Sequence, residues 1–464
     1  MSKKLISLVT ALAVIFMTPA TAFAVGGGSL ENASFSGEQL GLSGAVTATA
    51  DEPAAISYNP AGIVNLPGIQ VQGDANFLSS FTFKTSDTTG STRSTGTLHF
   101  VPTGYLTINP GEIFCDRVAF GIGTDSPFGL ANQYDSMNPA VHYTGWANYL
   151  KMYTIKPVMA VKVTDWLDIG GGPMWYRIYD FGAVQAYPNN LIFPYTWPDG
   201  QVRINLSGQH WGWQMGALVK PTKKHRFGFY FRSPVVVNVS GLGKVENSSF
   251  YPGGSYETGV HSKVPLPMNL TWAYAYQPTD KTHYEVDFTY NHWSTTKRLC
   301  FPADPTPSAA DNGIMSAIGT ADKDWGNSYG IQIGASHKFT KKLTGRCGSF
   351  FYWTPIPKTS FSPAVPDANR LSLSLGAGYA ISKYLTADIA YYNSFYFRRR
   401  INNSYPENAV WGSSSSVDGT YFSYLQAFTV SLTAHWDDIF PRADKDKGTQ
   451  KDVPAPSIEM TPIK

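Results

Sequence analysis

One serine–histidine pair has the residue types of a nucleophile and its general base. Ser336 and His337 are adjacent in the sequence stretch GASH, residues 334–337. Successive side chains of a β-strand point to opposite faces, so two neighbours on a strand cannot exchange a proton directly. The pair therefore gives no support for a hydrolase.

The cysteines do not form a recognisable metal or disulfide pattern. The chain contains three of them, without a C-x-x-C motif and without a histidine at ligand spacing. Three scattered cysteines are also too few for a disulfide framework. We expect no metal site and no cofactor. We interpret Cys115, Cys300 and Cys347 as residues that serve only packing.

Two basic side chains are better placed to bind a ligand. If the phenylalanines of residues 227–231 face outward on a strand, Arg232 faces inward. If Tyr153, Ile155 and the residues that alternate after them face outward, Lys156 faces inward as well. An inward cation can hold the carboxylate of a ligand, or it can pair with an inward acid such as Asp287. Both interpretations remain open at this stage.

The composition restricts the fold classes that can position these side chains. Charged residues make up 15% of the 464 residues, against about 25% in soluble domains. Aromatic residues reach 14%, so a disordered chain is excluded. The mean hydropathy of −0.18 and the lack of a long apolar run after the N-terminus exclude a bundle of transmembrane helices. A large soluble all-β protein and a transmembrane β-barrel remain.

Alternation of apolar and small polar residues favours the barrel. Leu371, Leu373 and Leu375 share one face of a predicted strand, and serines and glycines share the other. A soluble sandwich would expose Lys and Glu on its second face, whereas the inside of a barrel accepts Ser, Thr, Gly and Asn. Aromatic residues near predicted strand ends, such as Trp293 and Tyr384, are typical of interface girdles.

Connection lengths predict the number of strands. Short and long connections alternate along the chain, which is typical of outer-membrane barrels with periplasmic turns and extracellular loops. Six short and seven long connections imply fourteen strands and place both ends of the barrel on the periplasmic side. The short connections lie near residues 109–116, 164–165, 221–225, 278–281, 340–342 and 382–383, and the long ones near 86–95, 127–147, 188–200, 244–261, 300–324, 354–368 and 402–418.

The predicted organisation has four parts. Residues 1–24 read as a signal peptide, with Lys3 and Lys4 before an apolar stretch and an A-x-A site at 22–24. Its removal lowers the formal charge from +3 to +1, which gives no reason to expect a nucleic-acid partner. Residues 25–68 are rich in small residues and are predicted to plug the lumen. A barrel over residues 69–440 and a polar tail over 441–464 complete the chain.

The sequence resembles the FadL-type outer-membrane transporters of long-chain fatty acids, a family that also includes hydrocarbon-uptake proteins. The resemblance covers almost the whole mature chain and rests on several stretches in family order. These stretches are residues 41–45 (GLSGA), 51–63 (DEPAAISYNPAGI), 120–130 (FGIGTDSPFGL), 211–217 (WGWQMGA), 232–235 (RSPV), 266–272 (LPMNLTW) with 276–281 and 285–287, and 365–379 (VPDANRLSLSLGAGY).

The resemblance implies a fourteen-stranded antiparallel barrel plugged by an N-terminal hatch, in the outer membrane of a Gram-negative bacterium. It implies capture of long-chain fatty acids among extracellular loops, transfer to a lumenal pocket, and lateral exit where the third strand kinks inward. The loop segments 128–146 and 191–197 would make the capture surface. The implied partners are the hydrophobic ligand and outer-membrane lipid, including lipopolysaccharide, around a monomer.

The resemblance also implies roles for particular residues. Asn59 would face the gap and satisfy backbone groups that the kink frees. The gate residues are Asn59, Pro60, Ala61, Gly123, Asp125, Ser126 and Pro127, and the residues expected to bind ligand are Phe128, Lys156 and Arg232. One alternative is uptake of aromatic or aliphatic hydrocarbons, and an alternative of another class is an outer-membrane lipid hydrolase. A general porin would need more lumenal charges than this chain carries, and an adhesin would not need a hatch.

Overall fold

The computed structural model describes residues 31–32, 36–86, 90–96, 98–114, 116–138, 141–143, 145–187, 199–247, 255–305, 320–402, 417–437 and 439–440. The predicted signal peptide, the predicted tail and the loop segment 191–197 lie outside the described residues.

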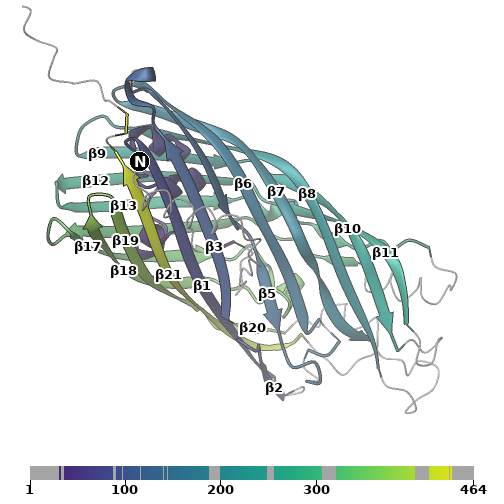
Figure 1. Ribbon diagram of the computed structural model, residues 1–464. Coiled ribbons are helices and arrows are strands. Elements are labelled where there is room, and N and C mark those ends of the chain that lie inside the picture. The colour runs from purple at the N-terminus through teal and green to yellow at the C-terminus, as the bar shows by residue number, and fades with distance from the viewer. Residues whose placement is uncertain are drawn as a thin grey trace, which may run out of the picture.

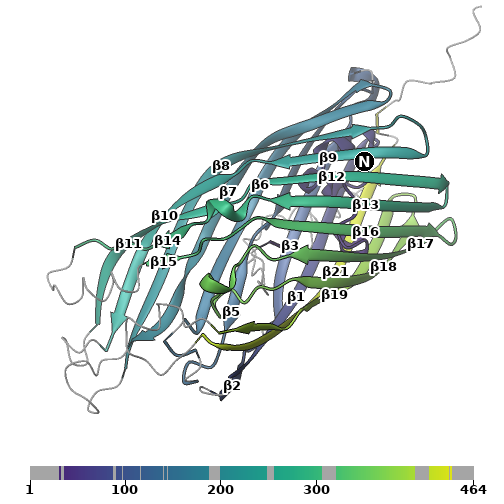
Figure 2. The ribbon, with the colours of Figure 1, turned by 180° about the vertical axis from the view of Figure 1, so that it is seen from behind.

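The described chain forms a closed antiparallel β-barrel (Figures 1 and 2). Strand β1 pairs with β3 on one side and with β21 on the other, which closes the sheet. The wall consists of β1 (Ile69–Ser86), β3 (Leu98–Ile108), β4 (Val118–Asp125), β5 (Leu130–Gln133), β6 (Ala147–Thr164), β7 (Leu167–Tyr187), β8 (Gly200–Val219), β9 (His225–Arg232), β10 (Val235–Glu246), β11 (Ser255–Leu266), β12 (Asn269–Thr279), β13 (Thr282–Asn291), β16 (Ser328–Lys338), β17 (Leu343–Trp353), β18 (Arg370–Ser382), β19 (Leu385–Tyr396) and β21 (Gly419–Trp436).

Three barrel strands are each split into two of the wall pieces named above, while β2 (Gly90–Arg93) and β20 (Arg399–Ile401) extend two other strands beyond a break. Strands β4 and β5 both pair with β6, and β9 and β10 both pair with β8. On the far side of β9 and β10, β11 pairs with β10 and β12 pairs with β9. The wall therefore has fourteen strands, as predicted from the connection lengths. Short strands also flank it: β14 (Arg298–Cys300) and β15 (Thr320–Asp322).

The two faces of the strands differ as a membrane barrel requires. On β18, Leu373 and Leu375 are 51% and 68% exposed on the outer face, whereas Ser372 and Ser374 are buried inside. A soluble sandwich would bury the leucines, since burying each would be worth roughly 1.5–3 kcal/mol. The predicted girdle residue Tyr384 is exposed, but Trp293 is buried and faces the lumen, so its assignment to the girdle was wrong.

The N-terminal segment lies inside the barrel, where Figure 1 shows it in purple. It contains α2 (Gly37–Gly41), η1 (Pro53–Ser57) and η2 (Pro60–Asn65), and nearly all of its side chains between residues 36 and 66 are buried. Two carboxylates of β13 hold it: Asp287 accepts the backbone N–H of Thr47 at 3.1 Å, and Glu285 accepts that of Ala48 at 2.6 Å. We call residues 36–66 the hatch.

One interruption of the wall lies between β4 and β5. The β3–β4 ladder ends at the pair Gly104–Thr124, and β5 pairs with β6. In the described chain no ladder joins β5 to β3, so the third barrel strand leaves the wall after Asp125 and returns at Leu130. Pro127 lies within this interruption and has no N–H to contribute to a ladder.

Candidate functional site

The interruption after β4 is held by the first described residues of the chain. Backbone N–H of Asn32 donates to the carbonyl of Pro127 at 3.0 Å, and its side-chain amide donates to the carbonyl of Ser126 at 2.9 Å. Glu31 forms a β-bridge with Phe128. The backbone groups that leave the wall are thus satisfied by residues 31–32 inside the barrel.

Asn59, Pro60 and Ala61 lie elsewhere than predicted. Asn59 caps η2, and its amide donates to the carbonyl of Thr47 at 2.7 Å and to that of Ala217 on β8 at 3.1 Å. A Cβ atom added to Gly170 of β7 would stand 2.7 Å from the carbonyl carbon of Pro60, so this turn packs directly on the wall. The prediction that Asn59 satisfies groups freed by the kink was wrong, because Asn32 does so.

Lys156 and Asp125 form a buried ion pair beside the interruption. The Lys156 ammonium donates to the Asp125 carboxylate and also to the Ser57 hydroxyl of the hatch at 3.2 Å. Thr154 donates to the same carboxylate at 2.5 Å. Lys156 is 1% exposed, and the Asp125 carboxylate neutralises its charge. Its partner is Asp125 rather than Asp287, and in this state it holds the hatch and is not aimed at a ligand.

Gly123, the remaining gate residue, allows close packing next to this pair. A Cβ atom on Gly123 would stand 2.6 Å from Cδ1 of Tyr105, a buried residue of β3. A larger residue would push β4 away from the tyrosine. Because Gly123 has no side chain, β4 can lie close to the Tyr105 ring just before the interruption.

Phe128 and Arg232 do lie together, inside the barrel. The guanidinium carbon of Arg232 stands 4.5 Å from the centre of the Phe128 ring, within cation–π distance. Trp293 meets the same ring edge-on, with 6.0 Å between ring centroids. Phe128 is fully buried, so the prediction that it begins an exposed capture surface was wrong.

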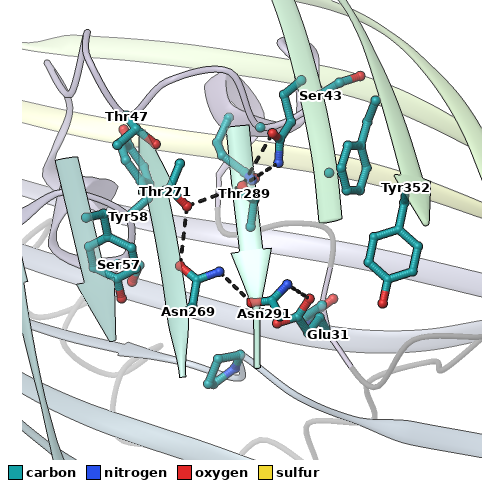
Figure 3. A pocket seen from close by; sticks show the side chains of 18 of the residues that line it. Glu31, Ser43, Thr47, Ser57, Tyr58, Asn269, Thr271, Thr289, Asn291 and Tyr352 are labelled. Carbon is teal, nitrogen blue, oxygen red and sulfur yellow. Dashed lines mark hydrogen bonds between the residues drawn. The ribbon is translucent and has the colours of Figure 1, made fainter. Parts of the chain in front are cut away.

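A carboxylate is bound next to this aromatic pair. Arg232 donates to Glu31 at 3.3 Å, and the amide of Asn291 donates to the other carboxylate oxygen at 2.9 Å (Figure 3). Asn269 donates to Asn291 at 2.6 Å and orients it. Burial raises the pKa of Glu31, whereas the positive charges of Arg232 and Arg370 act in the opposite direction. We call Arg232, Asn291 and Arg370 the anion site.

A cavity of about 140 Å³ lies beside the anion site, between the hatch and the inner faces of β12, β13 and β16 to β18. Most of the residues that line it have polar side chains, among them Thr271 and Thr289 from the wall and Tyr58 from the hatch (Figure 3). Arg370 lines it as well and stacks on Tyr352, 4.2 Å from the ring centre. The site therefore joins two guanidinium groups to aromatic rings.

The site contains residues to which the sequence alone gave no role. Asn269 and Arg370 belong to stretches that carried the family resemblance, but neither stretch assigned them a function. Glu31 and Asn32 stand in the segment predicted to plug the lumen. Trp293 was assigned to the membrane interface. Alternation places Asn269 and Asn291 on inward faces, and this signal could have selected them as candidates.

Other chemistry receives no support in the part of the chain that the structure describes. No group of three or more His, Cys, Asp and Glu residues there could hold a metal ion. No described helix has the length and apolar character to span a bilayer. His337 contacts the Thr282 hydroxyl at 2.9 Å, across the strand pair and away from the side chain of Ser336.

Comparison with known families decides the classification. The profile of the outer membrane protein transport protein family (OMPP1/FadL/TodX) matches residues 14–435. The chain belongs to this family. The FadL/TodX proteins are outer-membrane transporters of hydrophobic compounds rather than enzymes, and this barrel is accordingly an outer-membrane protein.

Relatives of the FadL/TodX family with different substrates resemble the chain. A long-chain fatty acid transport protein of Escherichia coli O6:H1 is 24% identical, covering 91% of this chain and 100% of that protein. The crystal structure of a Pseudomonas aeruginosa FadL homologue superposes with a TM-score of 0.74 at 18% identity, covering 88% of this chain and 99% of that one. The Ralstonia pickettii toluene transporter TbuX gives a TM-score of 0.61 at 17% identity over 87% and 99%.

Proposed function

We propose that this protein takes up long-chain fatty acids rather than uncharged hydrocarbons. The observation that carries the proposal is the anion site: Arg232 and Asn291 hold the carboxylate of Glu31 at the edge of the lumenal cavity. A fatty-acid carboxylate has the same two acceptor oxygens and could replace Glu31 there. A hydrocarbon has no group to offer these donors, and leaving them unpaired when buried costs free energy.

The aromatic residues beside the anion site suit the acyl chain. Phe128 and Trp293 are buried and belong to a large apolar cluster that includes Met174 and Leu266. Each methylene moved from water to such surroundings contributes about 0.8 kcal/mol. A ligand with one anionic end and a long apolar chain therefore matches both parts of the site.

The proposed exit route is the interruption between β4 and β5. Leu98 and Phe100 on the neighbouring β3 are 66% and 42% exposed on the outer face, so apolar surface flanks the interruption. Residues 31–32 close it from inside through Asn32. Displacement of Glu31 by a ligand carboxylate would loosen these contacts, and the ligand would then leave sideways into the membrane.

We also propose, from the sequence, that the extracellular loops capture the ligand first and that the protein acts as a monomer surrounded by lipopolysaccharide. The pairing of β1 with β21 supports the monomer, because the first and last strands leave no edge for pairing with a second copy.

The test is ligand identification with an anion-site variant. Mass spectrometry of apolar molecules that co-purify with the protein should find long-chain fatty acids. Arg232→Gln should lower fatty-acid affinity by about tenfold, the loss of one charge-assisted hydrogen bond. Arg226→Gln, near the periplasmic end of the same strand, is the matched control. Recovery of hydrocarbons without carboxylates, or equal affinity of the two variants, would contradict the proposal.

A further inference from the structure

A second irregularity of the wall lies between β11 and the chain that follows β13. Near the periplasmic half, the backbone N–H of His292 donates to the carbonyl of Met268 at 2.9 Å. Toward the extracellular end, the N–H of His261 donates to the carbonyl of Pro302 at 3.0 Å. Between these contacts, no backbone hydrogen bond joins residues 263–267 to 293–299 in the described chain. We call this stretch the seam; Figure 2 shows β11 diverging from β13 there.

The sequence of β11 suits an edge without a partner. Because His261 donates toward the seam, the residues two and four positions later direct their backbone groups to the same side. The second of these is Pro265, which has no N–H to leave unpaired, and Pro267 follows in the break before β12. In sheets, proline is found at positions whose backbone N–H would not join a ladder, such as edges and bulges. The seam is therefore part of the fold and does not arise from a lost hydrogen bond.

Trp293 closes the seam on the lumenal side. It is 1% exposed and packs edge-on against Trp325, with 5.3 Å between centroids, as well as against Phe128. Leu266 of β11 belongs to the same buried cluster. One tryptophan thus lies between the seam and the Phe128–Arg232 pair.

The outer side of the seam carries a cavity of about 530 Å³ between β10, β11 and β14. Lys263 and Arg298 line it, together with His261, Asn238 and Ser240, and no described acidic residue does so. Arg298 also pairs with Asp322 outside the lining, through Nε at 2.5 Å, so its two terminal nitrogens can still donate. The lining therefore favours an anion.

The cavity lies close to the membrane interface. Ile178, Gly208, Val239 and Ser262 are paired in one row across β7, β8, β10 and β11. The paired residues Trp175 and Trp211 stand three positions further toward the periplasm, and Trp211 is 61% exposed on the outer face. Three residues span about 10 Å of strand, so the cavity lies just outside an aromatic belt of the kind that marks the interface.

We propose that the seam is a second lateral port, through which an anionic amphiphile enters from the outer leaflet. Its carboxylate binds Lys263 and Arg298 outside the wall, and its chain passes Trp293 to reach Phe128. The carboxylate is then taken over by Arg232. This proposal rests on the proposed fatty-acid function, adds a route that bypasses the extracellular loops, and assigns the seam to uptake and the β4–β5 interruption to exit.

Photolabelling tests the port directly. A long-chain fatty acid carrying a diazirine is added to outer-membrane vesicles that contain the full-length protein, and the adducts are mapped by mass spectrometry. We expect adducts on both sides of the seam, in residues 260–268 and 293–303, and at the anion site. Lys263→Glu with Arg298→Glu should lower seam labelling by about tenfold. The matched control is the same reversal at Lys224 and Lys281, which lie in exposed periplasmic turns.

A reversible staple tests whether the port must open. Val260 and Ala303 are β-bridge partners at the extracellular limit of the seam, so a disulfide between cysteines there would keep β11 and the chain after β13 from separating further. In a background with the native cysteines changed to serine, this staple should slow fatty-acid uptake about tenfold, and reduction should restore it. A staple between Lys244→Cys and Glu257→Cys, which are paired on the closed edge of the same strand and lie outside the cavity lining, should have no effect.

The results separate this proposal from the one it rests on. Adducts at the anion site without adducts at the seam, or unchanged uptake by the stapled protein, would overturn the port and leave fatty-acid transport intact. A lack of adducts at both places would overturn both proposals.

Discussion

At the scale of single residues, basic side chains that point into the barrel lie against buried carboxylates. Arg346 bridges Asp388 and Glu38 at 2.6 Å each, and Lys220 meets Asp168 at 2.5 Å. The chain carries few charges, and these lumenal charges are paired with charges of opposite sign. An inward charge without a partner would carry the full cost of its desolvation.

The pair of Lys156 and Asp125 gives a prediction at this scale. Lys156→Met should destabilise the barrel by about 3–5 kcal/mol, because it leaves the buried carboxylate uncompensated. The free energy of unfolding in lipid, measured with guanidinium, tests this. Lys244→Met removes an ion pair with Glu246 that is largely exposed, and it should change stability very little. Equal stability of the two variants would contradict burial of the Lys156 pair.

At the scale of elements, proline lies in three of the breaks at which barrel strands leave the wall. Pro127 stands between β4 and β5, Pro234 between β9 and β10, and Pro267 between β11 and β12. The last two breaks are directly opposite each other, since Arg232 pairs with Asn269 before them and Val235 pairs with Leu266 after them. The breaks of these two neighbouring strands thus lie side by side, next to Arg232 of the anion site.

Straightening the first interruption should abolish uptake without unfolding the barrel. Asp125 pairs with Thr154 and Leu130 with Leu150, so β4 and β5 differ in register with β6 by one residue. Deleting Pro127 removes that residue and lets the two pieces join. Folding is checked by the heat-modifiable mobility of the barrel on gels, and uptake by growth on a fatty acid. Normal growth of the deletion variant would exclude the β4–β5 exit.

Docking of the hatch should depend on pH through Glu38. Burial raises the pKa of Glu38 from 4.5 to about 7, against the opposing effect of Arg346, with Asp51 and Asp388 acting in the same direction as burial. Because the docked state binds the proton more tightly, docking is most stable below pH 4.5 and weakens as the pH rises through about 7. Protease access to the hatch should increase over this range, and Glu38→Gln should reduce the dependence. An unchanged profile in that variant would assign the effect to other groups.

At the scale of the whole molecule, the barrel needs its hatch as a plug. Inward side chains alone can fill the interior of an eight-stranded barrel, but fourteen strands enclose a wider lumen that such side chains would leave partly empty. The hatch fills it with small residues that approach the wall closely: a Cβ atom on Gly348 of β17 would collide with the backbone of Leu42. The wall and the hatch are therefore complementary over a large contact.

Deleting residues 36–66 should make the protein leaky. The strands retain their ladder and their apolar outer face, so the barrel should still insert, while the lumen fills with water. Single-channel recording in planar bilayers should show a conductance that the intact protein lacks. If the shortened protein conducts no better than the intact one, the hatch is not the plug.

The sequence by itself determined the class, the strand count and the inward positions of Arg232 and Lys156. These follow from a side-chain period of two and from the demand of lipid for an apolar outer face, both of which are local properties. The partners could not be read in this way. Arg232 meets Glu31 at a separation of 201 residues, and Lys156 meets Asp125 rather than Asp287. Strand stagger and the path of the hatch decide such contacts, and these emerge only when the barrel closes.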